Sequence, residues 1–224
     1  MLERTLWQAL LLAAAFATAR IFQGRNWAKP VSLALAGVAA LHFAVFTLGW
    51  HNPLWDAQAV GGLPILNLLL PAYGLALAAT LWLARGLKSA VIIPSRLFDV
   101  AAMVLIAVFA LSELRQLFGG TILSDDPVGQ TEDLLRSLLG IVLAVGFLMW
   151  GSRKQSRTWR VGSLVLMLGA VVKVFVFDAN GLEGLVRIAS FVALGFSLIG
   201  IGWFYARQLA APKPEGSGAI APEM

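Results

Sequence analysis

The stretch VVKVFVFDANGLEGLVRIASFVALG, Val171–Gly195, sets four charged residues, Lys173, Asp178, Glu183 and Arg187, into two adjoining apolar blocks. Similar apolar blocks recur along the whole chain, each close to the ~20 residues that cross a bilayer as a helix. In lipid the backbone must satisfy its own hydrogen bonds, which leaves helices or closed barrels, and the alternating pattern of barrel strands is absent. The sequence therefore predicts an all-α fold, a polytopic integral membrane helix bundle.

The composition indicates the same class of protein. Of the 224 residues, 59% are hydrophobic and 13% are charged, and the mean hydropathy is +0.81. Such a chain has too few polar residues to cover a soluble globule. The apolar blocks predict seven spans, at residues 3–20, 31–49, 65–84, 97–118, 134–151, 161–177 and 184–206. We expect a single transmembrane domain over residues 1–209 and a disordered cytoplasmic tail, rich in Pro, Gly and Ala, over residues 210–224.

Basic residues gather in every second connection between these spans. The connections after the first, third and fifth spans carry Arg20, Arg25, Lys29, Arg85, Lys88, Arg96, Arg153, Lys154, Arg157 and Arg160. The stretches at residues 50–64 and 119–133 carry no Lys or Arg. Because Lys and Arg are retained on the cytoplasmic side, we expect a multi-pass protein of the cell inner membrane with its N-terminus outside and its C-terminus in the cytoplasm. The net charge of +5 then reflects the Lys and Arg residues of the cytoplasmic connections. We therefore expect the lipid bilayer, and no nucleic acid, as a partner.

The sequence carries few of the residues that usually build catalytic or metal centres. There is no cysteine, and the two histidines, His42 and His51, lie more than two helical turns apart on one stretch. We interpret His42 as a packed residue bonded to a neighbouring helix. No phosphate-binding or nucleophile-elbow motif is present. We therefore expect no metal and no cofactor, and the sequence leaves open whether the chain is an enzyme.

Two charged residues are expected deep in the predicted spans. Lys173 lies five residues, about 7.5 Å, below Asp178 at the outer end of the sixth span. Glu113 lies at nearly the same depth in the fourth span. Because an unpaired charge at such depth costs at least ~2.5 kcal/mol, we predict that Glu113 and Lys173 form a pair. The alternative is that Lys173 extends its ammonium group to the headgroups.

These residues belong to a larger group of charges at the outer end. We predict a cluster, either substrate-binding or structural, that consists of Glu113, Arg115, Lys173, Asp178 and Arg187. The fifth and seventh spans also open with similar sequences, EDLLR and EGLVR, which predict helix-opening ion pairs Glu132–Arg136 and Glu183–Arg187. This match suggests that residues 97–151 and 161–206 are related hairpins.

The C-terminal half resembles a known family. Leu134–Leu209, and above all the Lys-Val-Phe, Asp, Gly-Leu, Gly-Leu, Arg, Ser-Phe, Leu-Gly series between Lys173 and Gly195, resembles the end of the large bacterial membrane proteins of the domain of unknown function 2339 family. The ELRQLF sequence at Glu113–Phe118 supports the resemblance. It implies a multi-spanning envelope protein and no established reaction. Relatives with many more spans and a coiled-coil region imply that this chain is a short member or a C-terminal module.

Three functions remain open at this point. The outer cluster could bind or move an anionic or lipid-linked envelope substrate through its cationic residues. The chain could instead be a non-catalytic scaffold, a subunit that contacts other envelope membrane proteins. It could also be a membrane-embedded enzyme that uses Glu113 or Asp178 as an acid or base at the periplasmic face. An open cavity lined by Glu113, Lys173 and Arg187 would favour binding or catalysis, and a fully paired cluster would favour the scaffold.

Overall fold

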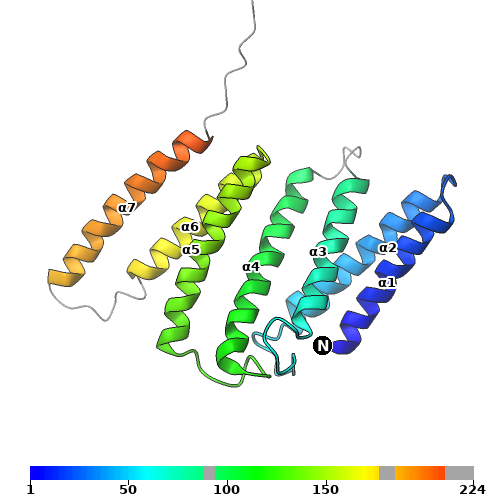
Figure 1. Cartoon of the computed structure of the whole chain (residues 1–224), viewed down its shortest axis with the longest axis horizontal. Coiled ribbons are helices and arrows are strands. Elements are labelled where there is room, and N and C mark those ends of the chain that lie inside the picture. Colours follow the sequence, from blue (N-terminus) through cyan, green and yellow to red (C-terminus); the bar gives the residue numbers. More distant parts are fainter. Residues whose placement is uncertain (88–93, 177–184, 210–224) are drawn as a thin grey trace, which may run out of the picture.

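The computed structural model describes residues 1–87, 94–176 and 185–209, without the side chains of residues 175–176, 185–190 and 208–209. Over these ranges the fold is all-α, as predicted, with seven α-helices and one π-helical segment, η1 (Figure 1). The elements are α1 (Leu2–Ile21), α2 (Ala28–His42), η1 (Phe43–Trp50), α3 (Leu69–Gly86), α4 (Ser95–Gly119), α5 (Gln130–Arg153), α6 (Arg157–Val176) and α7 (Leu185–Leu209).

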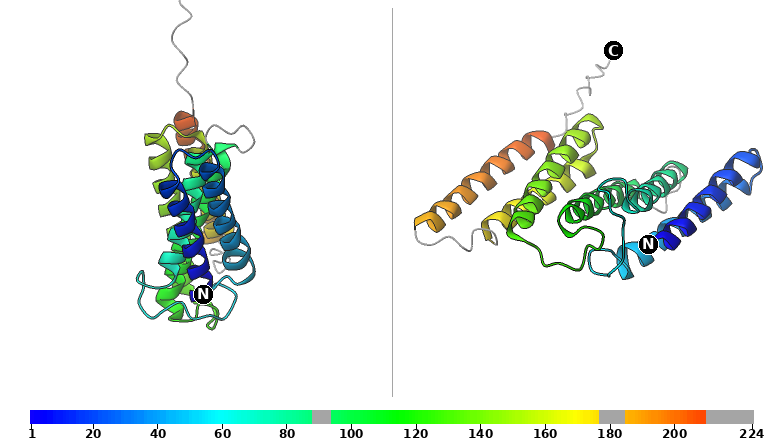
Figure 2. Two further views of the ribbon diagram at one scale, coloured as in Figure 1. Left: turned by 90° about the vertical axis from the view of Figure 1, so that its right-hand side faces the viewer. Right: turned by 60° about the horizontal axis from the view of Figure 1, so that its bottom comes forward.

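The helices stand side by side in chain order (Figure 1). The extensive helix contacts join elements that are neighbours, or next neighbours, along the chain, and those of α1 with α2 and of α5 with α6 are the largest. The same molecule is narrow when turned by 90° (Figure 2). The fold is thus an elongated row of helices, and many of its apolar side chains face outward, as expected for a protein surrounded by lipid.

Four helical segments in the described part of the chain are long and apolar enough to cross a membrane. They are Ala28–Trp50, Leu69–Gly86, Ser95–Gly119 and Gln130–Arg153. The helices α1, α6 and α7 contain 20, 20 and 25 residues and lie alongside them (Figure 1). The prediction of a helical membrane protein is confirmed at this level, and the crossing of all seven helices stays a prediction.

The predicted start of the third span, residue 65, is wrong, because α3 begins at Leu69. The side-chain oxygen of Asn67 accepts hydrogen bonds from the backbone N–H groups of Leu69 and Leu70, at 2.7 and 3.2 Å. Such a bond satisfies N–H groups that have no partner within the helix and so fixes its first turn. The apolar residues just before Asn67 form a loop instead of a helix.

The two ends of the row differ in charge. One end, here called the acidic end, holds the N-terminus and the loops 51–68 and 120–129, which contain no Lys or Arg (Figure 1). The other end, the basic end, holds the loops 22–27 and 154–156 together with the basic residues that flank them. The alternation of the basic connections therefore corresponds to two opposite ends of the structure, and which end faces the cytoplasm stays a prediction.

A close contact at the basic end joins α5 to α6. A Cβ atom added at Gly151 would lie 2.8 Å from the Cβ of Trp159 and 3.0 Å from the backbone nitrogen of Arg160. Only glycine fits at this position without a backbone shift. Further along, the hydroxyl of Tyr205 donates to the Oγ of Ser163 at 3.0 Å, which fastens α7 to α6.

Candidate functional site

A buried ion-pair network holds the loop between α4 and α5. Arg115 is 4% exposed, and its Nε donates to the Leu123 carbonyl at 2.7 Å, while its Nη1 lies 2.6 Å from the carboxylate of Glu132. Its remaining terminal nitrogen donates to the carbonyl of Asp126. Glu132 is 1% exposed and also accepts from Arg136 at 2.6 Å, which is the helix-opening pair predicted from the sequence. Both carboxylate oxygens of Glu132 are therefore paired with guanidinium groups.

A second network joins α4 to the loop before α3. Glu113 accepts hydrogen bonds from the backbone N–H of Ile65 and from the side-chain amide of Asn67, both at 2.8 Å. The amide of Asn67 also donates to the side-chain oxygen of Gln116, whose own amide donates to the Gly61 carbonyl at 2.7 Å. These three polar side chains fix the loop against the last turns of α4.

The two loops are also joined to each other at the acidic end. Ala59 and Ile122 form an isolated antiparallel bridge, and the N–H of Val60 donates to the carbonyl of Thr121 at 2.9 Å. Val60 and Leu123 are both buried in the hydrophobic core between η1, α3 and α4. The polar networks of Glu113 and Arg115 therefore support the two sides of one continuous surface, here called the platform, formed by residues 59–68 and 120–129.

The predicted Glu113–Lys173 pair is wrong. The ammonium group of Lys173 lies 2.9 Å from the carboxylate of Asp133 and donates to the hydroxyl of Ser137, also at 2.9 Å. Asp133 and Ser137 lie one turn apart on α5, which packs along α6, so α5 offers the nearest carboxylate. Glu113 is bonded to the loop before α3 instead, as described above. Lys173 and Asp133 are 32% and 42% exposed in their side chains, so this pair lies at the edge of the protein.

The other predicted site residues, Asp178, Glu183 and Arg187, lie wholly or partly outside the part of the chain that the structure describes. Asp178 and Glu183 lie outside the described residues, and Arg187 lies in the first turn of α7 with a side chain that is not described. The Glu183–Arg187 pair and the relation between the two hairpins therefore stay predictions. Of the five-residue cluster, the structure describes Glu113, Arg115 and Lys173 in three separate networks.

The residues that sequence reasoning missed are the polar partners of these networks, namely Asn67, Asp133 and Ser137. Each lies next to an apolar run, where no spacing rule connects it to a residue on another helix. The one available signal was Asn67 itself, because Asn is a favoured residue just before the start of a helix.

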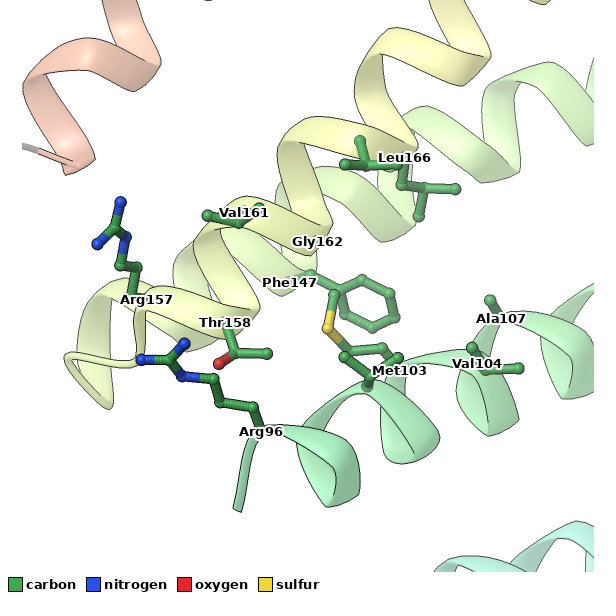
Figure 3. Close-up of a pocket in the computed structure, with 12 residues that line it drawn as sticks. Arg96, Met103, Val104, Ala107, Phe147, Arg157, Thr158, Val161, Gly162 and Leu166 are labelled. Atoms are coloured by element: carbon green, nitrogen blue, oxygen red, sulfur yellow. The ribbon is translucent and has the colours of Figure 1, made fainter. Parts of the chain in front are cut away.

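Three pockets in the described part of the chain are lined by other residues. One of about 590 Å³ lies between α4 and α6 (Figure 3), and one of about 700 Å³ lies between α3, α4 and α5. A third, of about 520 Å³, lies at the basic end of α1, α2 and α3. Glu113, Arg115 and Lys173 line none of these three.

The histidines have structural surroundings. The ring of His42 packs on that of Phe46, with 5.1 Å between the ring centroids, and its buried Nδ1 makes no hydrogen bond, so the bond expected there to a neighbouring helix is not seen at this atom. His51 lies in the loop after η1, with its Nδ1 2.8 Å from the carboxylate of Asp56. Within residues 1–87, 94–176 and 185–209, no group of three potential metal-ligating side chains comes together.

Comparison with known proteins gives one family. The family model described as "predicted membrane protein (DUF2339)" matches residues 1–208. No curated protein matches the chain, and no solved structure matches it.

Proposed function

The chain belongs to the DUF2339 family of predicted membrane proteins. We propose that it is a non-catalytic membrane scaffold whose platform contacts another membrane protein of the cell envelope. In this proposal all seven helices cross the inner membrane of a bacterial cell, and the acidic end faces outward. The observation that carries the proposal is the use of the polar side chains at the acidic end. There, the side chains of Glu113, Arg115 and Glu132 hold the two loops through bonds within the chain.

The platform carries an apolar tip that supports a contact role. Leu63, Ile65 and Leu66 are 65%, 63% and 74% exposed. Ile65 has a φ of +69°, a left-handed conformation that is costly for a β-branched residue, by about 1–3 kcal/mol. The bond from its N–H to Glu113 offsets part of this cost. A strained loop that is held in place and shows apolar side chains is typical of a recognition surface.

Substrate binding is the second candidate, and one observation favours it. The Lys173–Asp133 pair is partly exposed, and Arg187 lies in the first turn of α7, the helix that follows. An anionic or lipid-linked substrate that displaced Asp133 would gain the ammonium group of Lys173 as a contact. An enzyme has less support, because both carboxylate oxygens of Glu113 already accept hydrogen bonds from the loop before α3.

In-cell photo-crosslinking tests the scaffold proposal. A photoreactive residue at Leu66 is expected to give a discrete protein adduct, and one at Phe22 in the loop at the basic end is not. The Glu113→Ala variant, which releases the loop, should abolish the Leu66 adduct while the protein still accumulates in the membrane. Absence of a protein adduct at Leu66, or an adduct unchanged by Glu113→Ala, would contradict the proposal.

The same cells distinguish the second candidate. Under the scaffold proposal, Lys173→Gln should restore the phenotype of a deletion strain as well as the original chain does. Under substrate binding, Lys173→Gln should fail to restore it at normal folded yield, while the Leu66 adduct persists.

A further inference from the structure

A long apolar groove lies between α4 and α6 at the basic half of the row, with Phe147 of α5 at its base (Figure 3). Its volume is about 590 Å³, and its walls are formed by Val100, Met103, Val104, Val161, Val165 and Leu166. Gly162 contributes to its shape, because a Cβ there would overlap with the terminal carbon of Met103. From Arg157 to Leu166 the groove extends about 13 Å along α6.

The groove is open on the side that faces lipid. Val104 and Val165 are 43% and 65% exposed, although both are apolar. In a membrane this opening is filled by acyl chains from the bilayer. The groove therefore already offers an apolar path parallel to the helices, along which one chain of a lipid fits.

Two arginines stand together at the basic-end mouth of the groove. Arg96 is in the first turn of α4 and Arg157 is the first residue of α6. Figure 3 shows both side chains at the same end of the groove, with the Arg96 guanidinium beside Thr158 and the Arg157 guanidinium pointing away from it. Both are exposed, and within the described residues neither takes part in a hydrogen bond or an ion pair. The residues that line the groove include no Asp or Glu.

The helix ends that carry the two arginines make the mouth of the groove more positive. Both helices begin at this mouth, so their first N–H groups and the positive ends of their dipoles point toward it. Pro94 precedes α4 and supplies no side-chain hydrogen bond to that helix end. An anion at the mouth would meet two guanidinium forks that match a phosphate group.

We propose that this groove binds an anionic phospholipid, with the phosphate between Arg96 and Arg157 and one acyl chain along the wall of α6. The charge complementarity selects the phosphate, and the apolar walls select a lipid over a soluble phosphate compound. Basic pockets between membrane helices on the positively charged side are well suited to anionic headgroups. The site lies at the opposite end from the platform and does not depend on the scaffold function.

Native mass spectrometry of the full chain tests the site. The protein is released from nanodiscs made of equal parts of phosphatidylglycerol and phosphatidylcholine, and the retained lipid is counted. The original chain should retain phosphatidylglycerol preferentially. The Arg96→Gln, Arg157→Gln double variant should lose this retention by about tenfold or more, since each arginine contributes separately near the surface.

Two further variants serve as controls. Arg20→Gln with Arg153→Gln removes two exposed arginines from the same end, outside the groove, and should change retention by less than about twofold. Val165→Trp fills the groove, keeps both arginines and should also lower phosphatidylglycerol retention. Size-exclusion chromatography checks that each variant stays folded.

Several outcomes would overturn the proposal. These are unchanged retention in the Arg96→Gln, Arg157→Gln variant, an equal loss in the Arg20→Gln, Arg153→Gln control, or equal retention of phosphatidylcholine by the original chain. Unchanged retention in Val165→Trp together with displacement by glycerol phosphate would indicate a soluble anion instead of a lipid. A mass of two chains that replaces the lipid-bound form would identify a second copy as the occupant.

Discussion

The two ends of the same helices treat charge in opposite ways. At the acidic end, Arg115 and Glu132 are 4% and 1% exposed and bonded to each other. At the basic end, Arg96 and Arg157 are exposed and have no partner among the described residues. A buried charge is tolerated only when it is paired, whereas an exposed cation at a membrane surface can remain open to headgroups. The acidic end therefore uses Arg115 and Glu132 for structure, and the basic end keeps Arg96 and Arg157 available.

This difference between the acidic end and the basic end assumes that they lie on opposite sides of the membrane. A cysteine introduced at Gly129, on the platform, should react with an impermeant thiol reagent in intact cells, because the acidic end is expected outside. A cysteine at Ser156, in the loop between α5 and α6, should be shielded until the membrane is opened. Reaction at Ser156 with none at Gly129 would reverse the orientation, and reaction at both would show that the row does not cross the membrane as proposed.

The buried pair of the acidic end should dominate stability. Arg115→Met leaves Glu132 buried beside Arg136 alone and should lower the free energy of unfolding by about 3–5 kcal/mol. Adding Glu132→Gln should restore part of this loss, because the orphaned charge is removed. Unfolding in mixed micelles measures both. Arg153→Met, at an exposed basic-end position, is the matched control and should stay within about 0.5 kcal/mol. Strictly additive losses in the double variant would remove the claimed coupling.

Loss of the Glu113 carboxylate should destabilise mainly the loop before α3. Glu113→Gln loses a charged acceptor for the Ile65 N–H and should lower the free energy of unfolding by about 1–3 kcal/mol. Hydrogen exchange should quicken at residues 61–67 and stay unchanged at residues 120–129. Combining Glu113→Gln with Lys173→Met should give additive losses, since the two residues have different partners. A coupling above about 1 kcal/mol between them would restore the pairing predicted from the sequence.

The smallest effect on stability is expected at the basic end. Arg96→Gln and Arg157→Gln, separately or together, should each change the free energy of unfolding by less than about 0.5 kcal/mol in zwitterionic detergent, because neither side chain has a partner within the described protein. Addition of phosphatidylglycerol should raise the melting temperature of the original chain above that of the double variant. A large loss of stability in detergent alone would mean that the basic end is structural as well.

The architecture could be predicted from the sequence to a large extent. Blocks of apolar residues and the alternation of basic connections identify the helices and assign them to two ends, because both patterns depend on the bilayer, which is uniform along the chain. The local Glu132–Arg136 pair also follows from a spacing of four residues.

The partners of Glu113 and Lys173 could not be predicted in the same way. Glu113 and Lys173 are predicted to lie at similar depth, and that prediction alone made them a reasonable pair. Their real partners depend on which helix faces which, and on a loop that delays the start of α3 through the side chain of Asn67. Packing order and side-chain capping across elements leave no periodic signal in a single sequence, so the networks of the acidic end appear only in the structure.

The tight contact at Gly151 bears on how the chain enters the membrane. With only residues 154–156 between α5 and α6, the two helices cannot separate by much while the chain leaves the ribosome, so we expect them to enter the bilayer as one hairpin. Within that hairpin Asp133 already neutralises Lys173, so the ammonium group need not meet the hydrocarbon unpaired at any stage of insertion. A bulky side chain at Gly151 would hold the helices apart, and its main effect would fall on biogenesis, as rapid degradation of a chain that fails to insert.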